Sequence, residues 1–175
     1  MANTYTLITS QTLGSNTATI TLSSIPQTYN DLQLILTAGN DTVGTIFVRA
    51  NGSSTAVYNG SWMYGTGSGS TAINYDNNDN GYRGYGGAQS GTALSNGFLA
   101  ANRIYIGNYS STTRNKPMEW INEQSSNVTN NGLTGLGYNV WKNNTAISSL
   151  TIVGLSDLGL MTTGTSVALY GIKNT

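Results

Sequence analysis

Residues 31–36 read DLQLIL, and this run decides the fold class. Its apolar residues start at alternate positions and end as a continuous apolar stretch. Alternation with a period of two is typical of a strand with one buried face, and a continuous apolar run is typical of a strand inside a sheet. The preceding run ATITL (18–22) alternates in the same way, with Ile20 and Leu22 on one face. Both runs predict β-strands rather than helices.

Further strand-like runs follow along the chain, each rich in β-branched or aromatic residues and bounded by Gly, Asn, Ser or Pro. They span residues 45–50, 55–64, 98–107, 118–124, 136–142, 148–154 and 166–172. No window carries a sustained helical stripe. About nine or ten short strands at regular spacing predict an all-β chain, folded as an antiparallel β-sandwich or a barrel. We expect residues 1–175 to form a single domain, since this length suits one core.

The segment 65–97 breaks this rhythm, because its apolar residues thin out among Gly, Asn and Tyr. It predicts a long polar loop, and loops of this length are often functional. Within it, Tyr82, Arg83 and Tyr85 are the candidate contact residues for a partner, because Tyr and Arg are enriched at binding hot spots. No strand is expected to hold Tyr82 and Tyr85 inside the molecule.

Two familiar ligand motifs are only partly present in this segment. Residues 76–81, DNNDNG, match the first half of a calcium loop, but the twelfth position is Gly87 where the loop needs Glu. The glycines of 81–91 lack the Gly-Lys-Ser/Thr ending of a phosphate loop. We therefore expect neither a metal site nor a cofactor site.

The chain has no Cys and no His. This excludes disulfides, thiolate nucleophiles, His-ligated zinc and a Ser-His-Asp triad. Glu119 and Glu123 are the only glutamates. On a strand they lie about 13 Å apart, which is beyond the usual spacing of a glycosidase pair. We expect them on the solvent face of their strand, and we expect no catalytic residues and no enzyme.

Charge is scarce, at 8% of residues, with seven Lys and Arg against seven Asp and Glu. A typical soluble domain has about 25%. A net charge of zero with so few charged residues argues against binding to nucleic acid or to an anionic membrane surface, since both need clustered positive charge. The first residues lack the pattern of a signal peptide, and no stretch approaches the roughly 20 apolar residues of a membrane helix. We expect a soluble protein or part of a soluble assembly.

Eleven Tyr and three Trp stand against only two Phe. Tyr and Trp combine a large contact area with a polar handle, which suits both protein interfaces and sugar-stacking surfaces. Five aromatic residues on the strand-like runs are predicted to fill the core: Trp62, Tyr105, Trp120, Tyr138 and Trp141.

Three stretches together carry a resemblance to a known family. They are SIPQTYNDL (24–32), IYIGNYSSTTRNKPMEW (104–120) and the C-terminal LYGIK (169–173). The chain resembles a family of small virion proteins from tailed bacteriophages, common among phages of cyanobacteria. In this resemblance Pro26 and Tyr29 shape a turn, and Tyr170 lies in a closing strand.

The resemblance implies a jelly-roll-like β-sandwich that decorates or cements a capsid without catalysis. Its partner would be the major capsid protein, and the chain would sit on the capsid surface of the virion as a homo-oligomer, a dimer or a trimer. One alternative stays open, which is a tail-associated module that binds a receptor or a glycan. The Tyr and Trp content suits that alternative as well.

Overall fold

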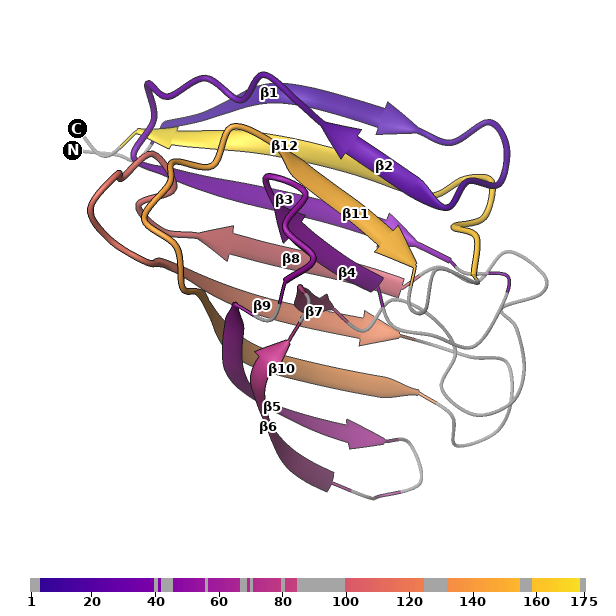
Figure 1. The fold of residues 1–175 in the computed structure, drawn as a ribbon. Helices are drawn as coiled ribbons and strands as arrows, with labels where there is room; N and C mark the ends of the chain where they lie inside the picture. The colour runs from indigo at the N-terminus through magenta and orange to yellow at the C-terminus, as the bar shows by residue number, and fades with distance from the viewer. Residues whose placement is uncertain are drawn as a thin grey trace.

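The described part of the computed structural model consists entirely of strands and their connections. It covers residues 4–39, 41, 46–55, 57–66, 69, 71–79, 81–84, 100–124, 132–154 and 159–173. These residues form twelve strands in two antiparallel sheets (Figure 1). Among them, no helix is long and apolar enough to cross a membrane. The predicted all-β antiparallel sandwich is therefore confirmed.

The larger sheet has eight strands. Their spatial order is β1 (Thr4–Thr12), β12 (Ser166–Lys173), β3 (Asp31–Ala38), β8 (Ala100–Ile106), β9 (Lys116–Gln124), β10 (Leu133–Trp141), β5 (Tyr58–Thr66) and β6 (Thr71–Asp79). The smaller sheet has four strands, in the order β2 (Thr19–Leu22), β11 (Leu150–Gly154), β4 (Ile46–Ala50) and β7 (Tyr82–Gly84).

The strand pairing shows how the chain winds. β1 pairs with β12, β2 with β11, β3 with β8 and β4 with β7, so the pairs are nested like a single long hairpin rolled into two layers. This is the winding of a jelly roll, as the resemblance implies. Two additional hairpins, β5–β6 and β9–β10, are inserted into the roll. They pair with each other through β10 and β5, and so extend the larger sheet.

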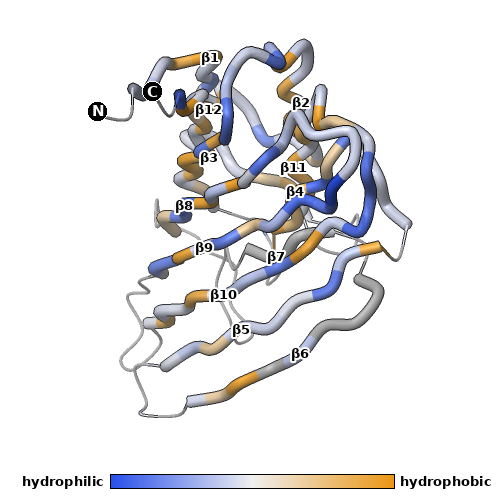
Figure 2. The backbone as a smooth tube through the Cα atoms, turned by 90° about the vertical axis from the view of Figure 1, so that its left-hand side faces the viewer, coloured by the Kyte–Doolittle hydropathy of each residue, from blue (hydrophilic) through white to orange (hydrophobic). Residues whose placement is uncertain are grey.

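The smaller sheet covers only part of the larger one. Its last strand, β7, contacts β9. Strands β10, β5 and β6 continue the larger sheet beyond it, as both ribbon and tube views show (Figure 2). The inserted hairpins thus give the molecule a wide sheet whose outer face is longer than a jelly roll alone would provide.

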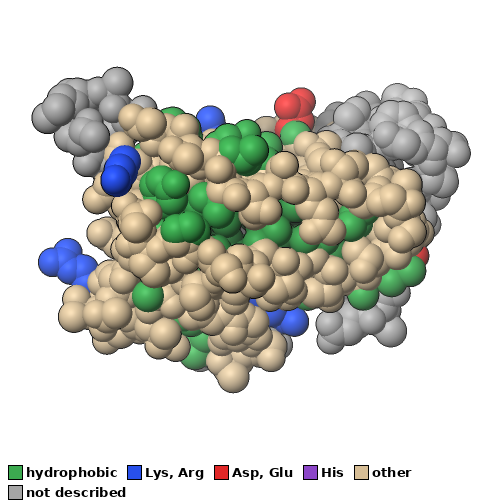
Figure 3. All heavy atoms as spheres, turned by 90° about the horizontal axis from the view of Figure 1, so that it is seen from above, with side chains coloured by type: hydrophobic (Ala, Val, Ile, Leu, Met, Phe, Trp, Pro, Cys, Tyr) green, Lys and Arg blue, Asp and Glu red, His purple; other side chains and the backbone are tan. Residues whose placement is uncertain are grey.

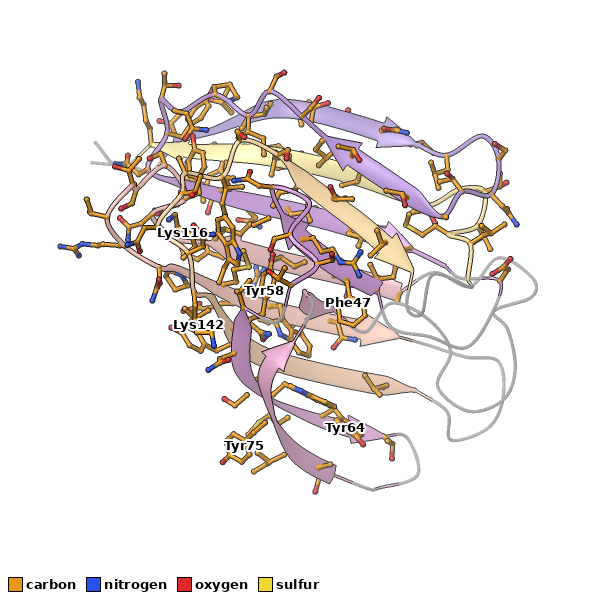
Figure 4. The ribbon with its side chains drawn as sticks, in the orientation of Figure 1. Phe47, Tyr58, Tyr64, Tyr75, Lys116 and Lys142 are labelled. Carbon is orange, nitrogen blue, oxygen red and sulfur yellow. The ribbon has the colours of Figure 1, made fainter. Side chains whose placement is uncertain are left out.

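The core between the sheets follows the predicted alternation. On β3, Leu32, Leu34 and Leu36 are fully buried, while the residues between them are half-exposed. Lys116 is also fully buried, and its Nζ donates to the carbonyl oxygens of Arg114 at 2.6 Å and Asn143 at 3.1 Å. Lys116 and Tyr58 lie in the interior (Figure 4). Burial lowers the pKa of Lys116.

The three stretches that carry the family resemblance meet at one end of the sandwich. The Tyr109 hydroxyl donates to the carbonyl of Pro26 and accepts from the Tyr29 backbone N–H at 3.4 Å. The Asn108 N–H donates to Asp31 Oδ1 at 2.8 Å. The Asn30 N–H donates to the carbonyl of Ile172 at 2.8 Å. These residues fix the turn before β3 to the β8–β9 connection and to β12, so their part in this corner is structural.

One prediction was wrong in part. Residues 65–97 do not form one continuous loop, because β5 extends to Thr66 and residues 71–79 and 82–84 are strands. The sequence of β6 can be polar because β6 is an edge strand, with a neighbouring strand on one side only among the described residues. Residues 85–97 lie outside the described residues. The first four residues of the DNNDNG motif, residues 76–79, belong to β6.

Candidate interaction surface

The candidate contact residues of the sequence do not all lie in a loop. Tyr82 and Arg83 belong to β7, opposite Val48 and Phe47 of β4. The expectation that no strand holds Tyr82 was therefore wrong, because main-chain pairing with β4 is enough to form a short strand in a Gly-rich segment. Tyr85 lies outside the described residues. A contact of these three residues with a partner stays a prediction.

The described surface that stands out is the outer face of the larger sheet. Opposed residues in antiparallel strands point to the same face, so the register assigns side chains to rows across the sheet. One row, the tyrosine row, runs from β8 to β6 through Tyr105, Glu119, Tyr138, Ser61 and Tyr75. It continues toward β1 through Gln33, Tyr170 and Leu7.

The neighbouring row is aliphatic. From β9 to β6 it consists of Ile121, Leu136, Met63 and Ile73, each opposite the next. These side chains keep 48%, 53%, 45% and 64% of their surface exposed. Outward-facing residues of an antiparallel sheet are usually polar. We call the tyrosine row and the aliphatic row together the outer band.

A groove of about 630 Å³ lies along the outer band. Its lining takes side chains from both rows, and Tyr5 of β1 lies at its far end. A second hollow of about 340 Å³ is lined by Met63, Ile73 and Leu136 together with the β5–β6 hairpin. Because the two hollows share these three residues, the apolar surface is continuous to the edge of the sheet.

Few charged groups lie along this groove. Arg103 and Glu119 line it, one of each sign, and Gln33 adds a neutral polar group. Burial, and then a hydrogen bond with the Asp31 side chain, raise the pKa of Tyr105. Tyr105 therefore stays a neutral phenol at physiological pH. Seen from above, over β1 and β2, the molecule presents mostly neutral side chains and backbone, with few charged groups (Figure 3).

The side chains that line the groove are mainly aromatic and aliphatic. Glu119 and Glu123 are both exposed on the outer face, as predicted. Among the described residues no group of three His, Cys, Asp or Glu side chains could hold a metal ion. Tyr75 projects from β6 away from the interior, with 77% of its surface exposed (Figure 4). Such side chains offer contact area for a partner.

The predicted aromatic core is right for three residues and wrong for two. Trp62, Trp120 and Trp141 are buried on the inner side of the larger sheet. Tyr105 and Tyr138 instead lie on the outer face, with 37% and 43% of their surface exposed. Successive side chains of a strand point to opposite faces of the sheet. Tyr105 lies between the buried Ile104 and Ile106 on β8, so its side chain must point outward.

The aliphatic row was missed at the sequence level. One signal could have revealed it, since Ile121 lies midway between Glu119 and Glu123 and must share their outward face. The other three residues of the row, Met63, Ile73 and Leu136, lie on other strands, and the sequence alone does not reveal how those strands pair. Only the pairing of β9, β10, β5 and β6 brings them side by side.

Comparison of the chain with protein-family models, with curated proteins and with solved structures finds no match in any of the three. The similarity to bacteriophage virion proteins therefore stays a prediction from the quoted residues.

Proposed function

We propose that this protein is a non-enzymatic structural component of a virus particle, which binds the major capsid protein on the outside of the shell and stabilises it. The observation that carries the proposal is the outer band, an apolar surface on a sheet face that normally faces water. The family resemblance supplies the identity of the partner, and the band supplies the contact surface.

The size of the band supports a protein partner. Of the ten exposed large hydrophobic side chains in the described part of the chain, all except Leu160 are on this face: Tyr5, Leu7, Met63, Ile73, Tyr75, Tyr105, Ile121, Leu136 and Tyr138. With roughly 200 Å² for each fully exposed side chain, their exposed fractions amount to an area on the order of 900 Å². The largest patch on a typical monomer is roughly 300–600 Å². One partner in a standard interface buries about 800 Å².

Composition supports the same partner class. Four aliphatic side chains form the row beside the tyrosines, and aliphatic groups gain by contact with apolar protein surface. The scarcity of charge means that little desolvation of charged groups opposes the contact. Repetition on a symmetric shell would let moderate contacts add up to firm retention.

The proposal is tested by adding the purified chain back to particles that lack it. We expect Leu136→Lys to lower the number of bound copies and to weaken binding by about tenfold or more. Ala101→Lys is the matched control, because Ala101 is exposed on the same face of β8 but lines neither hollow. Equal retention of both variants, or only a few copies per particle, would contradict attachment through the outer band.

A second candidate function is a glycan-binding module of the tail, and the tyrosine row favours it. Tyr75, Tyr105 and Tyr138 line the groove with the polar groups of Gln33 and Glu119, an arrangement that can stack on sugar rings and bind their hydroxyls. Binding to host polysaccharide that Tyr138→Ala abolishes and Leu136→Lys does not would favour this candidate over the shell protein.

A further inference from the structure

The edge of the larger sheet at β6 carries an inference beyond shell attachment. β6 is the last strand of the sheet, and within the described residues its second side pairs with no strand. Its outward backbone N–H and C=O groups are therefore a template for one more strand. No Lys, Arg or Pro interrupts residues 71–79, although such residues commonly protect edges.

The other three edges are less suited to pairing. β2 and β7, at the edges of the smaller sheet, have four and three residues, and short edges resist addition of a strand. β1 is nine residues long, but its register with β12 shifts between Leu7 and Thr9. Such a bulge breaks the pairing row in the middle of the strand. β6 pairs with β5 without a shift over the six residues from Thr71 to Asp76, and the register shifts only beyond them, toward Asp79.

Apolar exposure is also greatest at this edge. Ile73 and Tyr75 keep 64% and 77% of their surface exposed, the two highest values among the large hydrophobic side chains of the described residues. Met63 is in the aliphatic row with Ile73 but one strand further in, and its exposed fraction is 45%. A ninth strand beside β6 would cover the edge residues as β6 covers those of β5.

We propose that this strand is β6 of a second copy, paired antiparallel about a two-fold axis that passes at Asn74. The two larger sheets then join into one sheet of sixteen strands. A symmetric antiparallel pair always places one residue opposite itself. With Asn74 in that position, Ile73 of each copy lies opposite Tyr75 of the other.

This register is the one that the residues favour. It forms two pairs of a β-branched residue with an aromatic residue on the outer face, a combination that stabilises sheets. It also places Asp76 opposite Ala72, whereas an axis at Asp76 would place two carboxylates opposite each other. The outer bands of the two copies become one continuous surface. The pairing does not depend on which partner the band binds.

Cysteine cross-linking tests the register on a clean background, because the natural chain has no Cys. We expect Asn74→Cys to form a disulfide-linked dimer under mild oxidation. Opposed Cα atoms in an antiparallel pair lie about 4.5–5.5 Å apart, within reach of a disulfide. Thr71→Cys is the matched control, since its two introduced thiols would lie roughly 20 Å apart along the strands. Cross-linking of Thr71→Cys in place of Asn74→Cys would overturn the register.

The mass of the unmodified protein in solution tests the pairing itself. We expect twice the chain mass by light scattering for the natural sequence and for Leu136→Lys, and the monomer mass for Ile73→Lys with Tyr75→Lys. Dissociation by Leu136→Lys as well would assign the contact to the face of the sheet and overturn edge pairing. A monomer of the natural sequence would overturn it too, and would leave shell attachment through the outer band unaffected.

Discussion

Gly171 on β12 and the ring of Tyr29, just before β3, are in direct contact across the corner that holds the turn. A Cβ atom at position 171 would overlap the Tyr29 ring. Glycine is therefore required here for space rather than for an unusual backbone angle. The two residues belong to two of the three stretches that carry the family resemblance, so this contact gives that part of the pattern a physical cause.

We expect Gly171→Ala to lower the free energy of unfolding by about 1–3 kcal/mol, because the added methyl group must displace the packed ring. Urea denaturation measures the change. Gly65→Ala is the control, since a Cβ at Gly65, also on a strand of the larger sheet, meets no atom within 4 Å. In a Tyr29→Ala background the cost of Gly171→Ala should shrink. An undiminished cost would mean that the ring is not the obstacle.

Tyr58 sets a limit on stability at alkaline pH. Burial raises its pKa from 10.0 to about 12, while the Ala50 N–H, which donates to its hydroxyl at 2.8 Å, acts in the opposite direction. In the unfolded chain Tyr58 ionises near pH 10 and in the folded chain it keeps its proton. Its contribution is therefore complete below about pH 10 and is lost as pH rises toward about 12.

We expect the stability difference between the natural protein and Tyr58→Phe to be constant below about pH 10 and to decline between pH 10 and about 12. Taking the difference removes the effects of Tyr105 and Tyr109, whose pKa values are also raised, and of Lys116, whose pKa is lowered. Denaturant midpoints over this range measure it. A difference that does not vary with pH would show that Tyr58 ionises equally in both states.

At the scale of the strand, alternation was sufficient to find most elements but not all of them. The nine runs named from the sequence each overlap an observed strand. β1, β6 and β7 were missed, and each lies at the edge of its sheet. In β1 no residue is fully buried. Main-chain pairing alone holds such strands, and it leaves no periodic signal in the side chains.

The same limit explains why the candidate surface was not found from the sequence. Alternation places Leu136 and Ile121 on one face of their own strands, but it does not say which strands become neighbours. The aliphatic row exists because two inserted hairpins, far apart in the chain, pair through β10 and β5. The surface is thus a product of topology, whereas the buried core is visible in each strand.

Strand β10 offers a direct test of the two faces. Leu133 is 3% exposed and Leu136 is 53% exposed. We expect Leu133→Asp to cost more than about 3 kcal/mol or to prevent folding, because it buries an unpaired carboxylate. Leu136→Asp should stay within about 0.5 kcal/mol of the natural protein. Thermal unfolding compares the two, and a large cost at Leu136 would show that the outer band is covered in the isolated chain.

At the scale of the whole molecule, the nested pairing brings the two ends of the chain together. Thr4 of β1, the first described residue, lies opposite Lys173 of β12, the last one, and the two strands lie side by side in the larger sheet (Figure 1). The nested pairs join strands that are distant in the sequence, most of all β1 with β12 and β2 with β11. Such topologies fold slowly because loop closure precedes the stabilising contacts.

This arrangement predicts that a circular permutant keeps the fold. Joining the ends by a short Gly-Ser linker and opening the chain between Thr112 and Thr113 interrupts local contacts, in which the N–H groups of Thr113 and Arg114 donate to Ser111 Oγ. Both residues at the opening are exposed. We expect the far-UV circular dichroism and the cooperative unfolding of the natural protein to be preserved, with faster folding because β1 and β12 become a local hairpin.

Opening the chain between Leu34 and Ile35 is the control for the permutant. That position lies in the middle of β3, between β12 and β8, and the cut would separate backbone groups that pair on both sides. We expect this second permutant not to fold cooperatively. Most of the outer band is built from β5, β6, β8, β9 and β10, and β1, β3 and β12, which continue its tyrosine row, stay uncut. The first permutant should therefore also bind its partner as the natural protein does. Loss of binding in a permutant that folds normally would place part of the contact at the chain ends or at the opened turn, and not on the band alone.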